Sequence, residues 1–60
     1  MASEKYELLK KLIQEYRREE IRAQLKKGIM KEIPEEEKIR TLQDLVALRD
    51  PQIIKILSRE

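Results

Sequence analysis

The sequence contains no cysteine, histidine, tryptophan or phenylalanine, and only one glycine and two prolines in 60 residues. Without cysteine and histidine there is no thiol or imidazole to act as a nucleophile, a general base or a soft-metal ligand. Disulfide bonds are excluded for the same reason. A single glycine cannot build a phosphate-binding loop or a dinucleotide fingerprint. We therefore expect a non-enzymatic chain with no catalytic residues, no metal site, no cofactor and no small-molecule substrate.

Long apolar runs are also missing, and the first residues lack the basic-then-apolar pattern of an export signal. This pattern predicts a cytoplasmic protein that is neither secreted nor inserted in a membrane. The charged residues comprise 14 Lys and Arg against 12 Asp and Glu, a net charge of +2. Proteins that bind nucleic acid through a basic face usually carry a larger and more segregated excess. The mixture of signs favours solubility over binding to a polyanion.

Strong helix formers dominate the sequence, so we expect an all-α fold and one small domain over residues 1–60. Ser3 is a good N-cap, and the segment that follows reaches Gly28 without any helix breaker. Pro34 precedes three glutamates, a pattern typical of a helix start. Asp50 and Pro51 end one helix and open the next. The predicted helices cover about residues 4–27, 34–49 and 51–59.

The apolar residues of the first predicted helix fall on two sides. On one side Leu9, Leu12, Ile13 and Tyr16 form a stripe that we expect to pack against the two later helices. The expected partners there are Ile39, Leu42, Val46, Ile53 and Leu57. Nearly opposite lie Ile21 and Leu25, and Ile29 joins them if the helix continues past Gly28.

A straight helix over residues 4–27 is about 36 Å long, whereas a compact chain of this size is roughly 27 Å across. Part of the helix should then project beyond the core, with an exposed apolar strip at Ile21, Leu25 and Ile29. Met30 beside Ile29 either extends this contact surface or fills the gap between the first two helices. Such strips usually mark interfaces. The alternative is a break near Arg17–Glu20 that gives four short helices with one shared core. We favour the continuous helix because nothing in that tetrapeptide breaks helices.

The expected function is therefore a structural or interaction module that self-associates, by default as a two-fold dimer, or binds a partner helix through apolar faces. The alternative is a small nucleic-acid-binding module. It would use a basic face of the first helix formed by Lys11, Arg18, Arg22 and Lys26. We favour a solvated face there, because glutamates at i,i+3 and i,i+4 spacing accompany these cations and no aromatic residues interleave with them.

Two resemblances accompany these patterns. The strong helix formers and the Pro-Glu-Glu and Asp-Pro helix starts resemble those of de novo designed helical bundles. The high content of Glu, Lys, Arg and Ile in this sequence is also typical of thermostable proteins. The segment 47–54, Ala-Leu-Arg-Asp-Pro-Gln-Ile-Ile, is similar to the helix-to-helix joint of HEAT and armadillo repeats. That similarity covers less than a quarter of the chain and implies at most a role in protein contacts.

Overall fold

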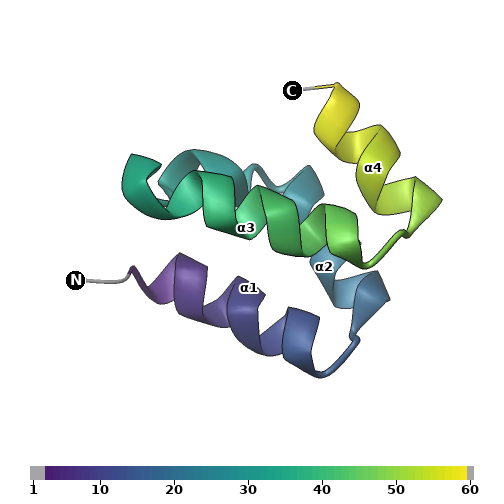
Figure 1. Ribbon diagram of the computed structural model, residues 1–60, viewed down its shortest axis with the longest axis horizontal. Helices are drawn as coiled ribbons and strands as arrows, with labels where there is room; N and C mark the ends of the chain where they lie inside the picture. Colours follow the sequence, from purple (N-terminus) through teal and green to yellow (C-terminus); the bar gives the residue numbers. More distant parts are fainter. Residues whose placement is uncertain (1–2, 60) are drawn as a thin grey trace.

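The computed structural model describes residues 3–59, which form four α-helices and one short 3-10 helix (Figure 1). Within these residues there is no strand, so the all-α fold class is confirmed. The expectation of one long helix followed by two shorter ones is wrong, because the first predicted helix is divided. The elements are α1 (Glu4–Gln14), α2 (Arg18–Lys26), η1 (Ile29–Glu32), α3 (Glu35–Ala47) and α4 (Pro51–Ser58).

The division between α1 and α2 is centred on Tyr16, whose φ of 56° lies in the left-handed region. The amide of Arg17 donates to the carbonyl of Leu12 at 3.0 Å, and the amide of Tyr16 donates to the carbonyl of Ile13 at 3.2 Å. These are the two hydrogen bonds of a Schellman motif, which normally has glycine at the left-handed position. The chain therefore turns just before Arg17–Glu20, close to the break in the four-helix alternative.

The turn forms because it brings both apolar stripes of the segment 4–29 onto one core. Burying Ile21, Leu25 and Ile29 contributes roughly 1.5–3 kcal/mol for each side chain. A left-handed non-glycine residue costs about 1–2 kcal/mol, so burial outweighs the strain at Tyr16. The molecule is 30 Å in its longest dimension, shorter than the roughly 36 Å of an unbroken helix.

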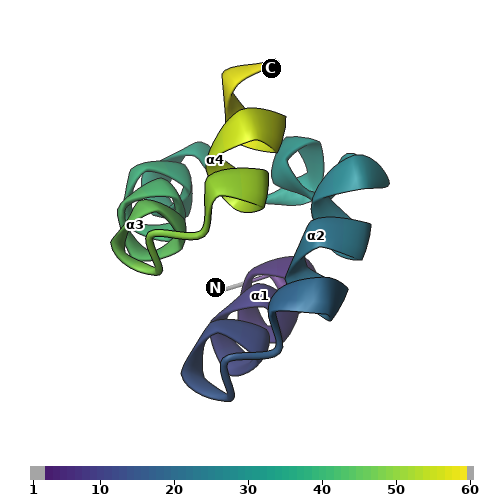
Figure 2. The same ribbon diagram turned by 90° about the vertical axis from the view of Figure 1, so that its right-hand side faces the viewer.

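The four α-helices surround the core in a ring. Seen from the side, α2 and α3 lie on opposite sides of the molecule, with α1 below and α4 above them (Figure 2). Accordingly, α1 packs against both α2 and α3, and α4 also packs against both. The buried apolar side chains are Tyr6, Leu9, Leu12, Ile21, Leu25, Ile29, Met30, Ile33, Leu45 and Ile53.

Most of the predicted helix ends are confirmed. The Ser3 hydroxyl accepts the Tyr6 amide at 3.0 Å, and Gly28 ends α2 with a φ of 83°. The Asp50 carboxylate accepts the Gln52 amide at 2.9 Å and so caps α4. Pro34, expected as the first helical residue, is instead the N-cap of α3, because its ψ of 145° is extended and the helix begins at Glu35.

The predicted core is only partly correct. Among its members, Leu9, Leu12 and Ile53 are buried, and Ile13, Leu42 and Leu57 pack against the core while half-buried. Three others are wrong: the exposed fractions are 71% for Tyr16, 68% for Ile39 and 51% for Val46. The first lies in the turn that replaces the long helix. The other two lie on α3, which turns a different face to the core.

We predict that Tyr16→Gly stabilises the chain by about 0.5–1 kcal/mol, because relief of left-handed strain exceeds the extra backbone entropy of glycine. Little packing is lost, since the tyrosine side chain is exposed. The matched control is Lys11→Gly, inside α1 and also exposed, which should destabilise by about 1 kcal/mol. Urea denaturation followed by circular dichroism measures both, and equal losses in the two variants would contradict this account of the turn.

Candidate interaction surface

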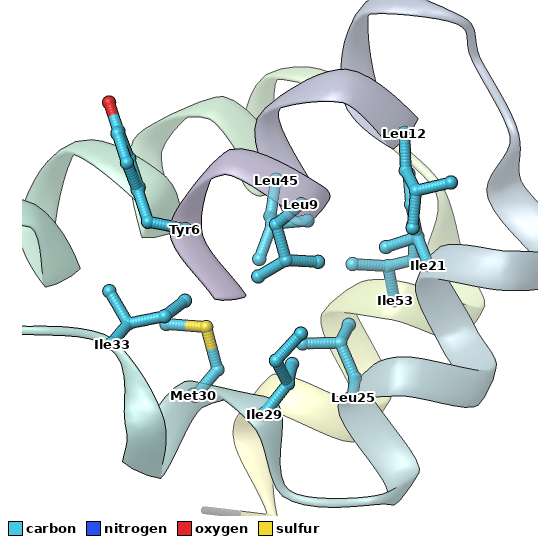
Figure 3. Packing of buried hydrophobic residues seen from close by; sticks show 10 residues of the cluster. All are labelled: Tyr6, Leu9, Leu12, Ile21, Leu25, Ile29, Met30, Ile33, Leu45 and Ile53. Carbon is cyan, nitrogen blue, oxygen red and sulfur yellow. The ribbon is translucent and has the colours of Figure 1, made fainter. Parts of the chain in front are cut away.

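The sequence-predicted interface residues lie inside the molecule. The exposed fractions are 0% for Ile21, 2% for Leu25, 2% for Ile29 and 5% for Met30. In Figure 3 these side chains point towards Leu9 and the other core residues contributed by α1, α3 and α4. The expectation that they form an exposed strip on an overhanging helix is therefore wrong. Within this conformation they pack against their own chain and have no surface to offer a partner.

Their burial follows from the two turns on either side of α2. The turn at Tyr16 points Ile21 and Leu25 inwards, and the left-handed Gly28 then redirects the chain into η1. Ile29 and Met30 belong to η1, so they reach the core from a separate element. The predicted straight helix over residues 4–27 holds Ile21 and Leu25, and Ile29 only if it continues past Gly28. Such a helix cannot turn both of its apolar sides towards one core.

We predict that Leu25→Ala lowers the free energy of unfolding by about 2–5 kcal/mol, as expected for a truncated core leucine. In a domain of this size that loss lowers Tm by more than about 8 °C, at every protein concentration. Lys11→Ala, on the exposed surface of α1, is the control and should change stability by less than about 0.5 kcal/mol. Thermal melts over a hundredfold range of protein concentration test this. If the Tm difference between the variant and the wild type shrinks as the concentration rises, Leu25 contributes to an interface between chains and the prediction is wrong.

The four basic residues of the nucleic-acid alternative do not form one open face. Lys11 lies on α1, whereas Arg18, Arg22 and Lys26 follow one another along α2. Arg18 donates to the carbonyl of Leu48 at 3.3 Å. Arg22 donates to the Asp50 carboxylate in the same region. Two of the four cations therefore point towards the junction between α3 and α4.

Arg22 forms the least exposed ion pair of the described residues. Its guanidinium lies 3.0 Å from the Asp50 carboxylate, and the side chains are 27% and 6% exposed. The other oxygen of Asp50 accepts the amides of Gln52 and Ile53 at the start of α4. One carboxylate thus caps α4 and ties it to α2, so the structure gives Arg22 a structural role.

We predict that Asp50→Ala lowers the free energy of unfolding by about 2–3 kcal/mol, because it removes the cap and leaves the Arg22 charge unpaired. Asp50→Asn keeps a capping oxygen and should lose less, about 1 kcal/mol. Asp44→Ala removes an exposed carboxylate of α3 and serves as the control. Chemical denaturation ranks the three variants, and a loss for Asp50→Ala no larger than for Asp44→Ala would contradict the role of this contact.

Two of the four large apolar residues that are exposed, Ile39 and Val46, lie on α3. Ile39 and Val46 are seven residues apart, or about two helical turns, so they share one side of the helix. Leu42 lies between them and is half-buried. We call the surface formed by Ile39, Leu42 and Val46 the outer face of α3. In Figure 1 α3 runs along the front of the molecule, with no other helix in front of it.

Hollows adjoin this face at Leu42. One is lined by Leu42, Gln43, Val46, Ala47 and Arg49. The other lies between η1, α3 and α4 and is lined by Met30, Lys31, Lys38, Leu42 and Leu57. The apolar row is therefore continuous with shallow depressions rather than a set of isolated side chains. Such contiguous exposed apolar surface is the usual mark of a binding site for another protein.

Charges of opposite sign stand at the two ends of α3. Glu35 and Glu36 are exposed in its first turn, and Arg49 follows its last turn. The ammonium of Lys38 lies 3.1 Å from the Glu35 carboxylate, so those two charges largely compensate each other. The outer face consequently has an acidic end at Glu36 and a basic end at Arg49.

Across residues 3–59 no three carboxylates converge to hold a metal ion. Within the same range no helix has both the length and the apolar character needed to cross a bilayer. Comparison with protein-family models, curated proteins and solved structures found no match to this chain.

Proposed function

We propose that this chain is a non-enzymatic interaction module that binds a helix of another protein chain through the outer face of α3. The observation that carries the proposal is the exposure of Ile39 and Val46, 68% and 51%, in a molecule whose remaining aliphatic residues are largely packed inside. Isolated exposed aliphatic residues are common in soluble proteins. Here they are aligned on one helix, with Leu42 completing the row.

The spacing suits a helix as the partner. Residues at i, i+3 and i+7 make one apolar stripe along a helix, and such stripes are the anchors through which two helices pack together. Ile39, Leu42 and Val46 have this spacing. Tyr16 and Ile54 are also exposed, but they belong to a turn and to α4 and are not part of this row. They therefore do not form a second stripe.

The nucleic-acid alternative has weaker support. Arg18 and Arg22 already donate hydrogen bonds to the chain itself, and Lys11 lies on a separate helix. A phosphate backbone would have to compete with the Asp50 carboxylate for Arg22. Burial of apolar surface by a partner helix requires no such exchange.

A neutral amphipathic helical peptide, with leucines at three- and four-residue spacing, is a suitable probe of the outer face. We predict that its binding perturbs the NMR signals of Ile39, Leu42 and Val46. The double variant Ile39→Gln/Val46→Gln should bind the probe about tenfold less tightly, because two half-exposed aliphatic side chains no longer contribute. Tyr16→Gln removes the most exposed apolar side chain elsewhere and is the control. Perturbations centred on another element, or equal binding by the double variant, would contradict the proposal.

A further inference from the structure

The outer face of α3 has aliphatic residues at equal distances from its middle and opposite charges at equal distances beyond them. Ile39 and Val46 are equally spaced from the midpoint between Leu42 and Gln43. Glu36 and Arg49 are also equally spaced from that midpoint, and they carry opposite charges. Reversing the direction of the helix therefore places an aliphatic residue over an aliphatic residue and a cation over an anion.

From this arrangement we infer that the partner helix is α3 of a second copy of the chain, packed antiparallel about a two-fold axis. The inference rests on the proposed function of the outer face. In such a dimer Ile39 lies opposite the partner's Val46, and the contact occurs twice because a two-fold interface uses the same patch on both subunits. Leu42 and Gln43 lie beside the axis.

The charges at the two ends of α3 select the antiparallel direction. In that direction Arg49 of each copy reaches the acidic end of the other, near the partner's Glu36. A parallel pair would instead place Glu36 over Glu36 and Arg49 over Arg49, and like charges in contact repel. Antiparallel packing also sets the two helix dipoles in opposition, which is the favourable arrangement.

A second copy fits the outer face better than a uniformly acidic helix does. Such a helix would be attracted by Lys31, Lys38 and Arg49, which lie around the two hollows. However, Lys38 is already bonded to Glu35, and Glu36 would repel an acidic partner at the other end. A partner that is acidic at one end and basic at the other matches both ends, and α3 itself has that pattern.

The expected dimer is weak. A stable interface usually takes about 800 Å² from each partner, and the whole chain exposes 4510 Å². One face of a 13-residue helix supplies less than that standard area. Association should therefore be reversible, with a Kd roughly between 1 μM and 1 mM, where interfaces below the standard size commonly fall.

Sedimentation equilibrium at low salt and up to millimolar chain concentration tests the inference through charge reversal. Glu36→Lys and Arg49→Glu should each raise the Kd of the homodimer about tenfold, because each reverses one partner of both end contacts. An equimolar mixture of the two variants should associate at least as tightly as the wild type, since every end contact again joins opposite charges. Glu36→Lys/Arg49→Glu on one chain should also recover the wild-type Kd.

Asp44→Lys is the matched control, because it makes the same change of charge on α3 away from the outer face and should leave the Kd within about twofold. All variants are first required to keep the helical circular dichroism of the wild type. If both charge-reversal variants lack it, Ile39→Gln/Val46→Gln takes their place, and a wild-type Kd in that variant overturns the inference.

The other outcomes are distinct. A wild type that stays monomeric at millimolar concentration overturns the second copy, while the neutral helical probe can still bind and leave the proposed function standing. A dimer that responds to Glu36→Lys no more than to Asp44→Lys overturns the antiparallel packing. A dimer abolished by Tyr16→Gly but not by charge reversal overturns it as well, because it indicates chains that exchange α1 through an opened turn.

Discussion

The structure depends on the turn at Tyr16, which lets two apolar stripes on opposite sides of one helical segment share a single core. A left-handed tyrosine is unfavourable by itself, and the hydrogen bonds from Arg17 to Leu12 and from Tyr16 to Ile13 hold it in place. The side chains of Ile21, Leu25 and Ile29 become buried as a result. The chain has no cysteine and therefore no disulfide, so the stability of so small a domain depends on the packing of these residues in its interior.

Each helix end that could be predicted has a residue whose chemistry favours that end. Ser3 and Asp50 accept amide hydrogen bonds, and Gly28 adopts the left-handed conformation that its missing Cβ allows. Tyr16 and Arg49 adopt the same conformation with φ of 56°, and nothing in their side chains signals it. At Tyr16 the reason is tertiary, because the apolar stripes on either side must reach one core. Local propensity alone favours a continuous helix there, and the structure does not have one.

The orientation of α3 escaped prediction for a related reason. Its inward face includes Thr41, which is 1% exposed, together with Leu45. A buried threonine is tolerated because its hydroxyl donates to the Glu37 carbonyl, one helical turn earlier, at 2.8 Å. Counting only apolar residues shifts the predicted core face of this helix towards Ile39 and Val46. For the same reason the candidate interaction surface on α3 was not predicted from the sequence. The general expectation that an apolar helix face binds a partner remains a prediction.

The ring of helices has one more consequence. Contacts run from α1 to α2, from α2 to α4, from α4 to α3 and from α3 back to α1, so every helix packs against two neighbours. Detaching any one of them opens the interior to water on two sides at once. A ring of this kind has no smaller subset of helices that keeps a closed interior, so we expect its unfolding to be a single cooperative transition rather than a sequence of separate steps.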